Sequence, residues 1–140
     1  MSDRVLLNTN LWIYLYSKEP ANKYESVSTL FLSHIKSLVL STQVLGELYN
    51  VLTKKKLQTQ EQAREIVSQL IDSFDISEIN ERHVASAMDV NARYKYSYWD
   101  SLLISTALIS DCSILYSEDM QHNQLIENKL RIINPFETQS

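Results

Sequence analysis

The sequence predicts an α/β domain with a mainly parallel central sheet of about five strands, covered by helices on both faces. Short apolar runs typical of β-strands recur along the chain, longer segments with helical spacing separate them, and the strand cores are apolar throughout rather than alternating. Continuous apolar strands are typical of parallel sheets that are buried on both faces. The alternation of strands with helices is typical of crossover connections between such strands.

The five expected strands are short, and at least one helical segment lies between consecutive members of the first four. Strands are predicted at residues 5–7, 38–40, 74–79, 113–116 and 131–133. Helices are predicted over about 22–36, 43–55, 60–73, 81–95 and 98–110. The chain has one glycine and two prolines, so we expect tight polar connections between long helices. It shows no repeat, low-complexity tract or linker, which predicts a single domain over residues 1–140.

The composition is ordinary for a soluble globular protein, with 44% hydrophobic and 21% charged residues. No apolar run reaches the roughly 18 residues of a membrane span, and the N-terminus lacks the layout of a signal peptide. The single cysteine, Cys112, cannot form an internal disulfide. We therefore expect a cytoplasmic protein without membrane association. The net charge of −4 argues against a large non-specific nucleic-acid surface but is compatible with a local basic patch.

Polar and acidic residues follow the predicted strands, at the sheet edge where α/β proteins usually bind ligands. Asn8 comes directly after the first strand, and Asp119 follows the fourth in the segment Ser117-Glu118-Asp119. Glu47 lies on the helix that follows the second strand, and Asp100 lies in the first turn of the last long helix. These side chains are therefore expected to gather at one edge of the sheet.

Each acid also has a structural explanation of its own. Glu47 belongs to a largely apolar helix face and is able to reach solvent from its edge. Ser97-x-x-Asp100 resembles a helix capping box, and Ser117 is suited to cap a short helix with Asp119 in its first turn. All of these explanations must hold together if there is no site, so the convergence favours a functional cluster.

The chemistry of such a cluster indicates phosphoryl transfer. Carboxylates brought close together repel one another and need a cation or shared protons. Oxygen ligands suit Mg²⁺ or Mn²⁺, whereas His34, His83, His122 and Cys112 show no zinc-site spacing. A carboxylate-bound Mg²⁺ commonly bridges to a phosphate, activates a water and stabilises the charge of an in-line displacement.

The chain resembles the PIN-domain ribonucleases, specifically the VapC-type toxins of type II toxin–antitoxin systems. The resemblance runs almost end to end and rests on "LLNTNLWIYL", Glu47, "YSYWDSLLISTAL", "ILYSEDMQHNQ" and "LRIINPF". It implies a three-layer α/β/α domain, Mg²⁺- or Mn²⁺-dependent endoribonuclease activity, a homodimer, and inhibition by a cognate antitoxin protein. It also implies an RNA substrate, with tRNA among the candidates, and catalytic and metal-binding roles for Asn8, Glu47, Asp100 and Asp119.

Asn8 departs from the family pattern, which has an aspartate at this position. The exchange keeps the shape but removes the charge and replaces one oxygen with a nitrogen that donates. We expect weaker metal binding and much reduced cleavage. Natural divergence and deliberate inactivation of a toxic ribonuclease both explain Asn8, and the three retained acids favour inactivation. Asn10 follows the family pattern and is expected to orient its neighbours or to act as the N-cap of a helix starting at Leu11.

Two other classes of function remain to be weighed. A catalytically inactive RNA- or antitoxin-binding PIN module is compatible with the same sequence. A signalling receiver is disfavoured, because the chain lacks a pair of adjacent acids after its first strand and a lysine after its late strand. For RNA contact, Arg93 and Lys95 lie near three aromatic rings, Tyr94, Tyr96 and Tyr98, that are suited to stacking.

Overall fold

The computed structural model describes residues 3–137 and contains a six-stranded sheet with the order β3-β2-β1-β4-β6-β5. Five strands pair in parallel, and the two-residue strand β5 pairs antiparallel with β6. The strands are β1 Val5–Leu7, β2 Leu38–Ser41, β3 Asp75–Ser77, β4 Ile114–Tyr116, β5 Leu125–Ile126 and β6 Leu130–Ile133. The predicted mainly parallel sheet is confirmed.

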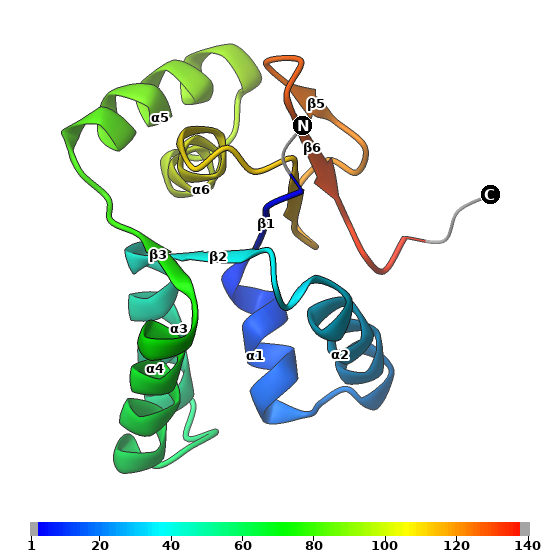
Figure 1. Cartoon of the computed structure of the whole chain (residues 1–140), viewed down its shortest axis with the longest axis vertical. Coiled ribbons are helices and arrows are strands. Elements are labelled where there is room, and N and C mark those ends of the chain that lie inside the picture. Colours follow the sequence, from blue (N-terminus) through cyan, green and yellow to red (C-terminus); the bar gives the residue numbers. More distant parts are fainter. Residues whose placement is uncertain (1–2, 138–140) are drawn as a thin grey trace.

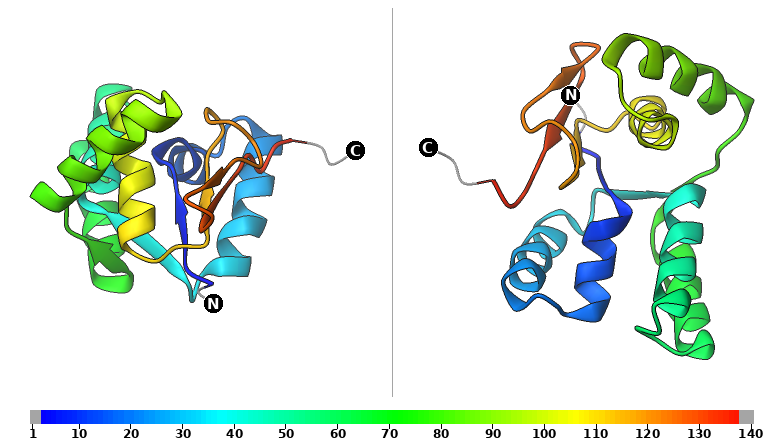
Figure 2. Two further views of the ribbon diagram at one scale, coloured as in Figure 1. Left: turned by 90° about the horizontal axis from the view of Figure 1, so that it is seen from above. Right: turned by 180° about the vertical axis from the view of Figure 1, so that it is seen from behind.

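Helices cover both faces of the sheet and complete three layers. They are α1 Thr9–Ser17, α2 Ala21–His34, α3 Thr42–Lys54, α4 Gln60–Ser73, α5 Glu81–Tyr94 and α6 Tyr98–Ile109. Helices α1 to α4 lie on one side of the sheet, and α5 and α6 lie on the other (Figure 1). Figure 2 shows the same separation from behind. The predicted α/β/α architecture is therefore confirmed, and the five predicted helices agree with the structure to within two residues at each end.

Helix α1 begins earlier than the sequence predicts. It starts at Thr9, and Asn8 is its N-cap, with extended backbone angles and a side-chain oxygen that accepts the Thr9 N–H. Asn10 therefore lies inside the helix, and the expectation that Asn10 caps a helix starting at Leu11 is wrong. The three polar residues after β1, Asn8 to Asn10, thus form the N-cap and the first two positions of α1.

Strand β5 was not expected, because its two residues carry no periodic signal. It joins β6 through a tight turn in which Glu127 and Asn128 both adopt left-handed backbone angles, with φ of 52° and 53°. Such turns usually contain glycine, which this segment lacks. Asparagine tolerates the left-handed conformation better than most residues, so the hairpin forms without the usual sequence signature.

The core lies between the central strands and the helices on each face. All three residues of β1 are buried, as are all four residues of β2. Helix α6 is buried from Ser101 to Ala107, because the sheet covers one side and α5 packs on another. This explains why α6 is apolar nearly all round, and it holds the helix N-terminus in a fixed place at the edge of the sheet. None of the helices that the structure describes is long and apolar enough to cross a membrane.

Candidate functional site

A pocket of about 320 Å³ opens where β1 gives way to α1, and α3, α6 and the segment after β4 complete its walls. Its lining residues are Asn8, Thr9, Asn10, Ile13, Glu47, Asn50, Val51, Asp100 and Asp119. The four candidate residues named from the sequence come from four separate segments, and all of them line this one pocket. Their convergence follows from the parallel sheet, which brings the carboxyl ends of β1, β2 and β4 to the same edge.

Asn8 is held by both atoms of its side-chain amide. Its Nδ2 donates to Ser117 Oγ at 3.1 Å, and its Oδ1 accepts the Thr9 N–H at 2.7 Å. Its backbone N–H also donates to the Tyr116 carbonyl at 2.9 Å. Asn8 therefore links the ends of β1 and β4, and it presents a neutral amide to the pocket.

Thr9 and Asn10 each hold one of the pocket's carboxylates. The Thr9 hydroxyl, which is buried, donates to Glu47 Oε1 at 2.8 Å. The Asn10 amide donates to Asp119 Oδ2 at 2.8 Å. This hydrogen bond agrees with the expectation that Asn10 orients a neighbouring group. The role of Thr9 was missed, because a threonine next to an asparagine reads from sequence as part of a helix start.

Glu118 and Asp119 are adjacent in sequence but have different surroundings. Glu118 accepts a hydrogen bond from the Tyr14 hydroxyl at 2.5 Å and forms an ion pair with Lys23, so it joins α1 and α2 to the segment after β4. Burial alone would raise the pKa of Glu118, but the hydrogen bonds from Lys23 and Tyr14 lower it overall. Asp119 lines the pocket. The structure therefore separates an acid that joins helices from an acid that belongs to the site.

Asp100 serves both as a capped residue of α6 and as a wall of the pocket. Its backbone N–H donates to Ser97 Oγ at 3.2 Å, which confirms Ser97 as the N-cap. Partial burial and the negative charge of Asp119 together raise the pKa of the Asp100 carboxyl, while the Ser97 side chain opposes this shift. The capping explanation and the site are thus compatible. The backbone N–H of Asp100 makes the cap, and its carboxylate interacts with the negative charge of Asp119.

The ligand atoms that the pocket offers are of the type that a hard divalent cation prefers. The acids of the pocket offer oxygen atoms, and the repulsion between Asp100 and Asp119 is the kind of strain that a cation relieves. Among residues 3–137, however, no three Asp, Glu, His or Cys side chains come close enough to hold a metal ion together. An ion bound here would therefore keep several waters, as Mg²⁺ commonly does.

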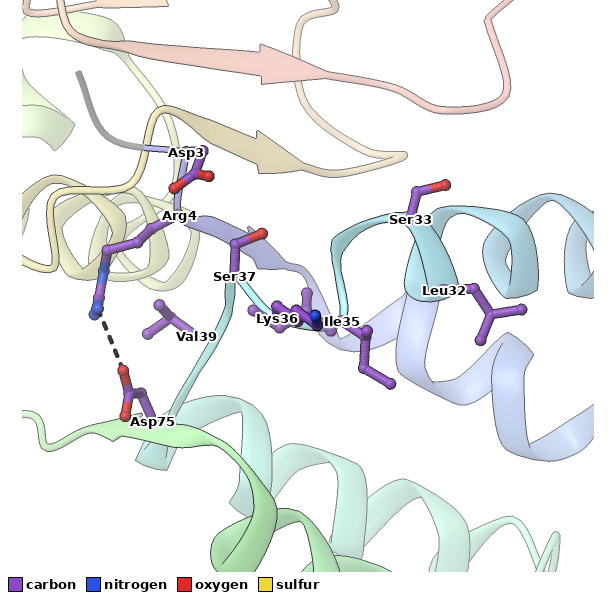
Figure 3. Close-up of a pocket in the computed structure, with 10 residues that line it drawn as sticks. Asp3, Arg4, Leu32, Ser33, Ile35, Lys36, Ser37, Val39 and Asp75 are labelled. Atoms are coloured by element: carbon purple, nitrogen blue, oxygen red, sulfur yellow. Dashed lines mark hydrogen bonds and ion pairs between the residues drawn. The ribbon is translucent and has the colours of Figure 1, made fainter.

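A second pocket, of about 440 Å³, lies at the opposite edge of the sheet. Figure 3 shows its walls, which come from the start of β1, the end of α2 and the start of β3. The Arg4 guanidinium and the Asp75 carboxylate form an ion pair across it at 3.3 Å. None of the candidate residues named from the sequence lines this pocket, so it is separate from the candidate site.

Two of the tyrosines considered for RNA stacking also donate hydrogen bonds through their hydroxyl groups within the protein. The Tyr94 hydroxyl donates to Glu127 at 2.8 Å, and the Tyr96 hydroxyl donates to Gln124 at 2.5 Å. These bonds anchor the β5–β6 region to the end of α5. Trp99, which directly precedes the pocket residue Asp100, is 65% exposed, and the sequence reasoning used it only as part of a motif.

Comparison with known proteins gives the family. The model of the PIN domain family matches residues 5–127. Among solved structures, a toxin–antitoxin complex from Klebsiella pneumoniae has a TM-score of 0.73 and 17% identity, over 96% of this chain and 99% of that chain. A DNA-bound VapBC from Salmonella typhimurium has a TM-score of 0.67 and 17% identity, over 93% of this chain and 96% of that chain.

VapC20 of Mycobacterium tuberculosis, described as a sarcin-ricin loop cleaving toxin, has a TM-score of 0.66 and 16% identity, over 79% of this chain and 86% of that chain. The search of curated proteins found no relative that matches. At these identities the structural likeness shows a shared fold. The match to the family model covers most of the chain, so the chain belongs to the PIN domain family.

Proposed function

We propose that the chain is a VapC-type toxin, a Mg²⁺- or Mn²⁺-dependent endoribonuclease whose activity is impaired by Asn8. The observation that carries the proposal is the convergence of Asn8, Glu47, Asp100 and Asp119 on one pocket. Membership of the PIN family supports it, and so do two similar structures, which are a toxin–antitoxin complex and a sarcin-ricin loop cleaving toxin.

We assign Asp100, Asp119 and Glu47 as metal or water-orienting ligands, and Asn8 occupies the fourth ligand position in impaired form. When bound, the ion supplies Lewis acidity, which lowers the pKa of a bound water and stabilises negative charge on the phosphate. Thr9 fixes the Glu47 carboxylate and Asn10 fixes the Asp119 carboxylate, so both acids are oriented before substrate arrives. Asn8 weakens the site because its amide adds no charge, and because its Nδ2, which donates to Ser117, cannot bind a cation.

The same proposal includes the partner, the oligomeric state and the cellular location of the protein. We assign to it a cognate antitoxin protein, a homodimeric state and a cytoplasmic location. The similar structures from Klebsiella pneumoniae and Salmonella typhimurium support an antitoxin partner, because they are described as a toxin–antitoxin complex and a DNA-bound VapBC.

The test is cleavage of a panel of structured RNAs, including tRNAs, in Mg²⁺ or in EDTA. The chain as it stands is compared with Asn8→Asp and with the double variant Asn8→Asp/Asp100→Ala. We expect metal-dependent cleavage by Asn8→Asp, much weaker cleavage by the parent chain, and none by the double variant. The control is Asp89→Asn in the Asn8→Asp background, because Asp89 is an exposed acid of α5 outside the pocket.

A second candidate function is an inactive PIN module that binds RNA or an antitoxin. The observation that favours it is the neutral Asn8 amide, whose two polar atoms are both satisfied within the protein. If Asn8→Asp binds RNA or a partner but cuts no RNA in Mg²⁺ or Mn²⁺, the nuclease proposal fails and this second function replaces it.

A further inference from the structure

Trp99 is a large apolar side chain in an unusual place. It is 65% exposed, whereas the other tryptophan of the chain, Trp12, is fully buried. A single exposed apolar residue needs no explanation on most surfaces. Trp99 is different because it directly precedes Asp100, a wall of the candidate site, so their Cα atoms are only about 3.8 Å apart.

The Trp99 ring has a fixed support. Tyr98 packs against it edge to face, with ring centroids 5.0 Å apart and an interplanar angle of 77°. The Trp99 carbonyl accepts a hydrogen bond from Gln43 Nε2 at 3.3 Å, which ties the first turn of α6 to α3 one turn before Glu47. The next seven residues of α6 are buried. The Trp99 backbone is therefore held between α3 and the buried part of α6, two helices that each contribute residues to the pocket lining.

The negative charge of the chain and of its pocket disfavours RNA binding through phosphate contacts alone. Most nucleic-acid binding gains its affinity from cations placed against phosphates. This chain has a net charge of −4, and its pocket is lined by Glu47, Asp100 and Asp119. Stacking of a base on an aromatic ring adds affinity without requiring positive charge, and it accepts any base that offers a free face.

We propose that Trp99 stacks on an unpaired base of the RNA beside the nucleotide whose phosphate enters the pocket. This inference rests on the proposed function and adds to it a substrate-binding residue that does not itself line the pocket. A base inside a duplex is stacked on both faces by its neighbours, so it offers no free face to the indole. Trp99 is thus a substrate-binding residue, and Tyr98 is its positioning residue.

The experiment measures binding in EDTA, so that no cleavage occurs. A short single-stranded RNA oligonucleotide, and the same strand annealed to its complement, are titrated against the chain. We expect the single strand to quench tryptophan emission, because Trp99 contributes the exposed component while the buried Trp12 gives a constant background. The duplex should bind more weakly and leave the emission unchanged.

Three variants sharpen the measurement. Trp99→Ala should weaken binding of the single strand roughly 5- to 150-fold, and Trp99→Phe should restore most of the affinity. The dependence of affinity on salt should keep the same slope in Trp99→Ala, since stacking releases no counterions. The matched control is Met88→Ala, which removes an apolar side chain of α5 that is 58% exposed, and it should bind like the parent.

Several results would overturn the inference. One is equal affinity of the parent and Trp99→Ala for the single strand, and absence of any RNA binding is another. A change of oligomeric state in Trp99→Ala with unchanged RNA affinity would assign the ring to a protein interface.

Cleavage measurements distinguish failure of this inference from failure of the proposed function. If Asn8→Asp cuts RNA equally well with and without Trp99, only the stacking inference fails. If RNA quenches Trp99 but Asn8→Asp cuts nothing, only the nuclease proposal fails.

Discussion

The Asn8 amide donates a hydrogen bond to the Ser117 hydroxyl oxygen at 3.1 Å and so joins the carboxyl ends of β1 and β4. In this contact Ser117 Oγ is an acceptor, and the Asp119 N–H donates to it as well, at 3.4 Å. An aspartate at position 8 has no donor, so the Ser117 hydroxyl would have to rotate and donate instead. Position 8 is therefore able to take either residue at the cost of one hydroxyl rotation.

The first prediction concerns metal affinity and needs no RNA. Asn8→Asp should bind Mn²⁺ at least about tenfold more tightly than the parent, because a carboxylate adds both charge and an oxygen ligand. Isothermal titration calorimetry measures the change. Ser117→Ala in the Asn8→Asp background should lose part of the gain, because it removes the hydroxyl that orients the new carboxylate. Equal Mn²⁺ affinity of the parent and Asn8→Asp would remove position 8 from the set of metal ligands.

Much of the fold was predictable because the strands are apolar on both faces. A buried parallel strand needs no alternation, so runs such as 5–7 and 38–40 stand out from the amphipathic helices between them. Once the strands are placed, the parallel arrangement fixes which edge collects their following residues. That is why Asn8 and Asp119, which are 111 positions apart in the chain, were expected at the same edge.

The role of each residue in the site was less predictable, because it depends on contacts between distant segments. The sequence shows Glu118 and Asp119 side by side, but Lys23 and Tyr14 decide which of the two is held away from the pocket. The start of α1 depends on which asparagine turns its oxygen toward a backbone N–H. The exposure of Trp99 depends on how α6 packs, and no local pattern reports it.

The second prediction concerns the electrostatic coupling of two acids. The pKa of Asp100 is raised by burial and by the charge of Asp119. Asp119→Asn should therefore lower the pKa of Asp100, while burial keeps it above the value in an unfolded chain. Carbon-detected NMR titration of the Asp100 carboxyl measures the shift, and Asp89→Asn, which is outside the pocket, should leave it unchanged. No movement of the Asp100 pKa in Asp119→Asn would show that the two carboxylates are not coupled.

The coupling also has a consequence for stability. Because the pKa of Asp100 is higher in the folded state, the folded protein holds this proton more tightly than the unfolded chain does. Its contribution to stability is greatest below the unfolded pKa and falls as pH rises through the folded pKa. Asp100→Asn should therefore gain stability relative to the parent at neutral pH and lose this advantage in acid. Urea unfolding over a pH series checks the sign.

The third prediction concerns Thr9, whose buried hydroxyl holds the Glu47 carboxylate at 2.8 Å. In the Asn8→Asp background, Thr9→Val should reduce RNA cleavage about 10- to 100-fold, as the loss of an orienting hydrogen bond commonly does at metal sites. Thr9→Ser keeps the hydroxyl and should restore most of the activity. The fall should be in kcat rather than KM, because Thr9 acts through Glu47. A Thr9→Val variant that cuts RNA at the unaltered rate would make this hydrogen bond structural only.

The fourth prediction concerns acid stability and Glu118. Burial tends to raise the pKa of this carboxyl, but the hydrogen bonds from Lys23 and Tyr14 outweigh burial and lower it. A lowered folded pKa stabilises the protein above the ordinary glutamate pKa of about 4.5, and that stability is lost as pH falls through the folded value. Glu118→Gln should therefore lower the Tm by several degrees at neutral pH and reduce the difference in Tm between neutral and acid conditions.

The control for this prediction is the matching change at the neighbouring acid. Asp119→Asn removes a carboxylate that has no ion pair with Lys23 and that repels Asp100, so its Tm should not fall below that of the parent at neutral pH. Circular dichroism melts of the two variants and the parent at neutral and acid pH give the comparison. Cleavage should show the reverse order in the Asn8→Asp background, with Glu118→Gln active and Asp119→Asn inactive. If Glu118→Gln kept the full pH dependence of the parent, the Glu118 contacts would not be the source of its acid sensitivity.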